Sequence, residues 1–106
     1  MRRSVRYRLS VPIVVLWENE RGIIQREQAI TRDLSTEGVF VFSTLALARG
    51  THVALEVQLP SFGDPARGPR LVGHGQVVRV DREGENRGFA IRTDSGLSFP
   101  SANENA

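Results

Sequence analysis

Cysteine and lysine are absent from this chain of 106 residues, and histidine occurs only twice, at His52 and His74. Without cysteine the chain has no disulfide, no thiol nucleophile and no thiolate metal site. Two histidines are too few for a convincing metal cluster. We therefore expect no metal site, and the lack of cysteine fits a reducing compartment.

Long hydrophobic segments are also lacking. The longest apolar stretch, Val11 to Trp17, is far shorter than the roughly 20 residues that a membrane-spanning helix needs. Arginines precede it as in a secretory signal, but Pro12 interrupts it and no small-residue cleavage site follows. We expect neither membrane insertion nor secretion, and hence a cytoplasmic protein.

The sequence contains no P-loop, no GxGxxG and no Ser-His-Asp arrangement. Its densest acidic run, Asp81 to Glu85, is typical of a solvated turn rather than of a carboxylate pair for acid–base work. We therefore expect a binding protein rather than an enzyme, without a cofactor.

The fourteen basic residues are all arginine and are unevenly placed. Residues 1–17 hold four arginines and no acid, a charge of +4, whereas the rest holds ten arginines against twelve acids, a charge of −2. Arginine presents a planar fork suited to phosphate and to guanine edges. The acidic remainder and only seven aromatic residues argue against a surface for polymeric nucleic acid.

Short segments rich in β-branched residues alternate with turn signals, which predicts strands rather than helices. In His52–Leu59 every second residue is apolar, the period of a half-buried strand. Gly73 and Gly75 suggest a bulge or a barrel corner. We predict an all-β fold, a six-stranded antiparallel barrel with strands at Leu9–Trp17, Ile23–Thr31, Gly38–Phe42, His52–Leu59, Leu71–Val80 and Gly88–Arg92.

Two short motifs stand out against this background. Arg2 and Arg6 form an RxxxR before the first predicted strand, and Asp33, Ser35 and Gly38 form a DxSxxG before the third. RxxxR alone has little value in a chain so rich in arginine, and DxSxxG is also a common turn sequence. Together with the last two predicted strands, in this order and spacing, the motifs resemble the PilZ domain, a bacterial β-barrel that binds cyclic di-GMP.

The resemblance implies a role for each motif residue. Arg2 and Arg6 would contact a phosphate and the guanine Hoogsteen edge, with Arg3 adding charge beside them. The opposite edge of guanine carries only N–H donors, so a carboxylate is its natural acceptor. The three remaining motif positions would follow the family pattern, with Asp33 and Ser35 at that guanine edge and Gly38 allowing close approach of the backbone.

The placement of the arginines suggests how such a protein would work, because a segment with four arginines in eight residues repels itself and has little to bury. We expect residues 1–8 to be a mobile arginine-rich segment, 9–97 the barrel and 98–106 a polar tail with little or no C-terminal helix. Ligand binding would order the first segment and signal to a protein partner in motility, exopolysaccharide or virulence control. Two alternatives stay open: a PilZ-like protein-interaction adaptor that does not bind cyclic di-GMP, and a small-barrel nucleic-acid-binding protein.

Overall fold

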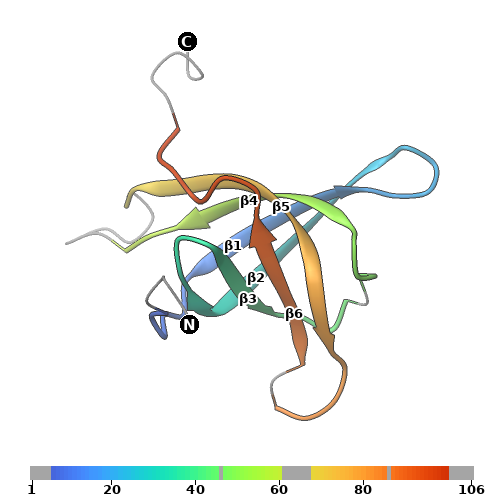
Figure 1. The fold of residues 1–106 in the computed structure, drawn as a ribbon, viewed down its shortest axis with the longest axis horizontal. Coiled ribbons are helices and arrows are strands. Elements are labelled where there is room, and N and C mark those ends of the chain that lie inside the picture. Colours follow the sequence, from blue (N-terminus) through green and yellow to red (C-terminus); the bar gives the residue numbers. More distant parts are fainter. Residues whose placement is uncertain (1–5, 46, 61–67, 86, 101–106) are drawn as a thin grey trace.

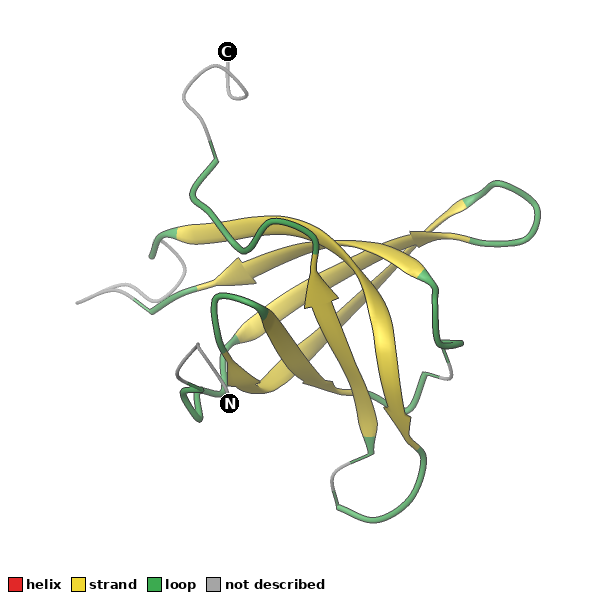
Figure 2. Ribbon diagram, in the orientation of Figure 1, coloured by secondary structure: helices red, strands yellow, loops and turns green. Residues whose placement is uncertain are grey.

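The computed structural model describes residues 6–45, 47–60, 68–85 and 87–100 of the chain. These residues form strands and loops only (Figure 2). Among the described residues there is no helix that is long and apolar enough to cross a membrane. The six strands, labelled in Figure 1, are β1 (Pro12–Glu18), β2 (Ile24–Leu34), β3 (Gly38–Phe42), β4 (His52–Gln58), β5 (Arg70–Asp81) and β6 (Gly88–Thr93).

The strands close into an antiparallel barrel in the order β1-β2-β3-β6-β5-β4, with β4 pairing back to β1. Closure removes the unpaired edges that an open sheet of this size would expose. The β1–β2 hairpin extends beyond the barrel, because β4 pairs with β1 only from Ile13 to Leu16 (Figure 1). The predicted all-β barrel of six strands is confirmed.

Alternating side chains of each strand fill the barrel. In β4 the residues Val53, Leu55 and Val57 are buried and their neighbours are not, as the sequence pattern predicts. Each fully buried side chain of this size contributes about 1.5–3 kcal/mol relative to an exposed one. The core also contains Val11, Ile13, Val15, Leu34, Val39, Val41, Leu47, Val77, Phe89 and Ile91.

The strand boundaries differ from the prediction where β1 and β2 meet the N-terminal segment. β1 begins at Pro12 rather than Leu9, and β2 continues past Thr31 to Leu34. β2 continues to Leu34 because it pairs with β3 as far as that residue. The late start of β1 is caused by Thr31, which is fully buried. Its hydroxyl accepts a hydrogen bond from the amide of Val11 at 3.0 Å and donates one to the carbonyl of Leu9, replacing regular pairing there.

The prediction for the glycines of β5 is half right. Gly75 pairs with Val53 of β4 and with Thr93 of β6, so β5 changes partner there, as at a barrel corner. The bulge, however, lies between Val77 and Arg79 rather than at a glycine.

After β6 the described chain continues without a helix, as expected. The backbone of Ser98 pairs with Val72 through two hydrogen bonds of 2.8 and 3.0 Å, and Leu97 packs against the core. The predicted division into residues 1–8, 9–97 and 98–106 stays a prediction, and residues 101–106 lie outside the described part of the chain.

Candidate ligand-binding site on the outer barrel face

A bulge in β2 turns two neighbouring side chains toward the outside of the barrel. The register between β2 and β3 shifts between Thr31 and Asp33. Thr31 and Leu34 are both buried, so the two residues between them share the outer face, opposite Phe40 of β3. Arg32 and Asp33 therefore lie side by side, which strict alternation would forbid.

The bulge in β5 has the same effect on the other side of β3 and β6. It places Val78 and Arg79 together on the outer face, opposite Ala90 of β6. Across four strands the register then forms one outward-facing row: Asp33, Phe40, Ala90 and Arg79.

The N-terminal segment runs along the end of β2. Beyond the Thr31 contacts, Tyr7 and Leu34 exchange two backbone hydrogen bonds, each of 2.9 Å. This pairing places the preceding residue, Arg6, beside Asp33, where its terminal nitrogen Nη1 lies 3.6 Å from the carboxylate oxygen Oδ1.

The Asp33 carboxylate is held by two arginines of different character. Nε of Arg32 donates to Oδ2 at 2.7 Å, and the Arg32 side chain is only 18% exposed. Arg6 makes the longer contact to Oδ1 and is 44% exposed. A carboxylate that is 9% exposed requires such partners, since an unpaired buried charge is strongly unfavourable.

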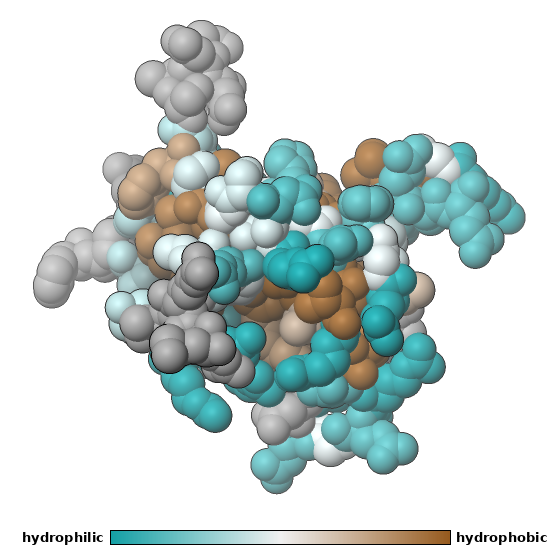
Figure 3. Space-filling view, in the orientation of Figure 1, coloured by the Kyte–Doolittle hydropathy of each residue, from teal (hydrophilic) through white to brown (hydrophobic). Residues whose placement is uncertain are grey.

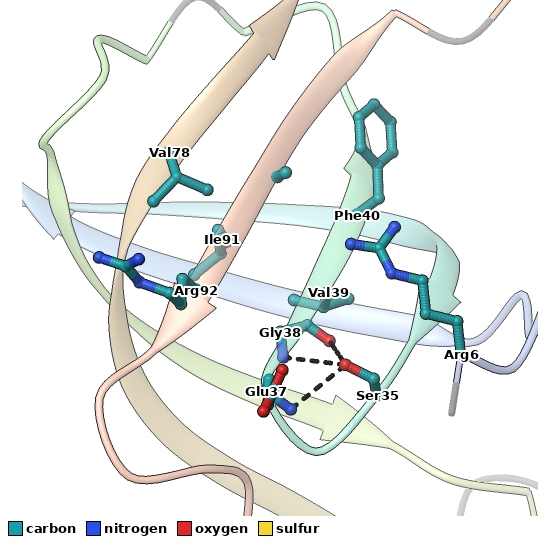
Figure 4. Close-up of a pocket in the computed structure, with 10 residues that line it drawn as sticks. Arg6, Ser35, Glu37, Gly38, Val39, Phe40, Val78, Ile91 and Arg92 are labelled. Carbon is teal, nitrogen blue, oxygen red and sulfur yellow. Dashed lines mark hydrogen bonds between the residues drawn. The ribbon is translucent and has the colours of Figure 1, made fainter. Parts of the chain in front are cut away.

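Ser35 organises the turn between β2 and β3. Its hydroxyl oxygen accepts hydrogen bonds from the amides of Glu37 and Gly38, each at 3.2 Å (Figure 4). The backbone amide of Ser35 donates to the carbonyl of Gly38 at 2.9 Å. A Cβ on Gly38 would lie 2.4 Å from the carbonyl oxygen of Ile91. The packing of β3 on β6 therefore requires this glycine independently of any ligand.

A pocket of about 190 Å³ lies over this turn and over β3 and β6. Figure 4 shows Arg6 on one side of it and Arg92 of β6 on the other, with the turn below. Val39, Phe40, Val78, Ala90 and Ile91 supply apolar lining, and Figure 3 shows a hydrophobic area bordered by hydrophilic side chains in the middle of the molecule. Glu37 also lines the pocket.

The structure brings Arg6, Asp33, Ser35 and Gly38 to one end of β2 and β3, although they are spread over 33 positions of sequence. Asp33 itself does not line the pocket, because Arg6 and Arg32 cover its carboxylate. The other two predicted site residues, Arg2 and Arg3, lie outside the described residues.

Sequence reasoning missed Arg32 and Arg92 as members of this face. A signal for Arg92 was present, since it stands between buried Ile91 and Thr93 and so must face outward. Arg32 carried no such signal, because its position depends on the bulge.

Comparison with protein families finds that the model of the PilZ domain matches residues 1–105. The chain belongs to the PilZ family. The matched range includes both motifs, and the roles of Arg6, Asp33, Ser35 and Gly38 in ligand binding stay predictions. A comparison with curated proteins finds no match.

Two solved structures resemble this PilZ domain. The inhibitor of motility of Bacillus subtilis, MotI/DgrA, is 16% identical with a TM-score of 0.68. The alignment covers 99% of this chain and 46% of that protein, so this chain spans less than half of its length. The PilZ domain of CeSA from a cellulose-synthesizing bacterium is 27% identical with a TM-score of 0.53, covering 84% of this chain and 80% of that one.

Proposed function

We propose that this PilZ domain is a receptor for cyclic di-GMP, which binds at the β2–β3 end of the outer barrel face and alters contact with a protein partner. The observation that carries the proposal is the convergence of Arg6, the Ser35 turn and Arg92 around one pocket, with Asp33 paired to Arg6 beside it.

These groups match the chemistry of the ligand. Cyclic di-GMP carries two phosphates, and two arginines on opposite sides of a pocket suit such a dianion. Asp33 supplies the acceptor for the donor edge of guanine, and an arginine can bond to guanine O6 and N7. The apolar side chain of Val78, which lines the pocket and is exposed, suits a purine face.

Binding would exchange one partner of Asp33 for another. The 3.6 Å contact from Arg6 is partly solvated, and such exposed ion pairs contribute only about 0–1 kcal/mol. A guanine base could therefore displace Arg6 from Oδ1 at little cost, which frees the arginine for the ligand.

The pocket is smaller than the roughly 300–1,000 Å³ of ordinary small-molecule sites. It suits one base with its phosphate, and the rest of the ligand would lie on the surface. By the family resemblance, Arg2 and Arg3 would contact this outer part of the ligand. Ordering of this segment over the ligand would create the surface that a protein partner reads.

Calorimetric titration of the whole chain with cyclic di-GMP tests the proposal, with cyclic di-AMP as the ligand control. Arg6→Ala is the site variant, and Arg8→Ala, two residues away and exposed, is its matched control. We expect saturable binding of the guanine ligand alone, weakened roughly 10- to 100-fold by Arg6→Ala because a charge-assisted hydrogen bond contributes about 1.5–3 kcal/mol. Arg8→Ala should bind like the natural chain.

Absence of heat up to about 100 μM ligand would contradict the proposal, because only binding weaker than about −5.5 kcal/mol escapes detection there. The protein-interaction adaptor would then be the better account. An equal loss of cyclic di-GMP affinity in Arg6→Ala and Arg8→Ala would indicate that positive charge in this segment attracts the ligand in general, without a specific contact from Arg6.

A further inference from the structure

Arg32 makes two separate contacts on the outer face of the barrel. Its Nε donates to Asp33 Oδ2 at 2.7 Å, and its Cζ lies 3.9 Å from the centre of the Phe40 ring. The guanidinium is thus held from below by an aromatic ring and from the side by a carboxylate.

Phe40 is itself unusual, because it faces outward and is nevertheless only 1% exposed. Arg32 covers it, Arg79 approaches it with Cζ at 5.6 Å from the ring centre, and Phe42 meets it edge-on at 6.1 Å between centroids. A large aromatic side chain placed outside the core and completely covered forms a firm support for Arg32.

We infer that Arg32 is a positioning residue that gives the site its selectivity for guanine, by fixing the Asp33 carboxylate while Arg6 leaves it. The inference rests on the proposed function. A carboxylate accepts about four hydrogen bonds. Oδ2 can therefore keep the Arg32 contact and still accept one guanine donor, and Oδ1 accepts the other once Arg6 has moved.

The contrast between the two arginines supports this division of roles. Arg32 contacts the carboxylate at 2.7 Å and is 18% exposed, whereas Arg6 contacts it at 3.6 Å and is 44% exposed. The bulge of β2 adds to the difference, because it turns the Arg32 side chain to the same face of the barrel as Asp33. A carboxylate fixed in direction rejects a base that lacks one of the matching donors.

The test compares cyclic di-GMP with cyclic di-IMP, whose hypoxanthine bases lack the 2-amino donor. The full chain, Arg32→Gln and Arg32→Lys are titrated with both ligands. Arg70→Gln is the matched control, since Arg70 also pairs with a carboxylate, Glu56 at 2.6 Å, but on β5 and away from the pocket. Thermal unfolding verifies that each variant is folded.

The natural chain should prefer cyclic di-GMP by roughly 10- to 100-fold, since a site built to bond a donor rejects the analogue without it. Arg32→Gln should bring this ratio to within about threefold of unity, mainly by weakening cyclic di-GMP. Arg32→Lys keeps a charged donor and should retain most of the ratio, and Arg70→Gln should leave it unchanged.

If Arg32→Gln leaves the ratio of the two ligand affinities unchanged, the inference is wrong, whether both affinities fall together or neither falls. The proposal that the natural chain binds cyclic di-GMP would still stand. If the natural chain binds neither ligand, the proposed function fails and this inference fails with it.

Discussion

The two ends of β2 carry hairpin turns that are built alike and surrounded differently. In the β1–β2 turn the side-chain oxygen of Asn19 accepts hydrogen bonds from the amides of Arg21 and Ile23, at 2.9 and 3.0 Å. In the β2–β3 turn the hydroxyl of Ser35 does the same for Glu37 and Gly38. Both are polar side chains that satisfy turn amides.

What differs is the neighbourhood of each turn. The β1–β2 turn extends away from the barrel into solvent (Figure 1). Beside the β2–β3 turn lie a bulge, the paired N-terminal segment and the outward side chains of β6. Turn chemistry alone therefore does not make a site, and the neighbours of the turn do.

Removing the acceptor at the β2–β3 end should have the largest effect. Asp33→Asn replaces a carboxylate oxygen by an amide donor, which opposes the guanine donors, and we expect a loss of cyclic di-GMP affinity of about 100-fold or more. Calorimetry measures it. Asn19→Ala, the matching change at the other turn, should leave affinity unaltered, and a loss there would contradict the distinction between the two ends.

The glycines of the two hairpins should differ in their effect on stability. Gly38→Ala places a Cβ against the carbonyl of Ile91, so β3 or β6 must shift, at a cost of about 2–3 kcal/mol. Gly22→Ala meets only the flexible Glu18 carboxylate but has a φ of +77°, at a cost of about 1 kcal/mol. Urea unfolding of both variants compares them, and equal costs would show that the close approach of β6 relaxes freely.

Thr31 should link the N-terminal segment to the site. Thr31→Val keeps the shape of the side chain but leaves the amide of Val11 and the carbonyl of Leu9 without their hydroxyl partner. We expect a loss of about 1–3 kcal/mol in the free energy of unfolding, measured in urea. Cyclic di-GMP affinity should also fall, because Arg6 is then held less firmly beside Asp33. A loss of stability with unchanged cyclic di-GMP affinity would contradict the prediction, because it would show that the N-terminal segment does not contribute to binding.

The smallest effect is expected at Arg92. Arg92→Gln removes a charge from the far side of the pocket, at a residue that is exposed and solvated, so affinity should fall by only about two- to fivefold. The loss should shrink at high salt, because added ions screen the same attraction. A loss that does not depend on salt would point to a direct bonded contact instead.

Much of the barrel could be predicted from the sequence, because period-2 alternation and turn residues are local signals. The alternation of Val53, Leu55 and Val57 defined β4, and the polar run after Val80 defined the β5–β6 turn. The family motifs identified Asp33, Ser35 and Gly38 in the same way, from residues close in sequence.

The bulges could not be predicted, since an extra residue in a strand leaves no periodic trace. As a result the outward position of Arg32 beside Asp33 was missed, and the bulge of β5 between Val77 and Arg79 was not located. The contact between Arg6 and Asp33 could not be predicted either. It depends on the hydrogen bonds by which Thr31 and Leu34 hold the N-terminal segment, which is distant from them in sequence.

Amide hydrogen exchange of the full chain, with and without cyclic di-GMP, tests the central claim most directly because it reports on both ends of β2 at once. The account predicts slower exchange in residues 2–8 and 35–38 when ligand is added, and no change in residues 18–24. Unchanged exchange in residues 2–8 and 35–38, or slowing confined to the β1–β2 hairpin, would contradict it.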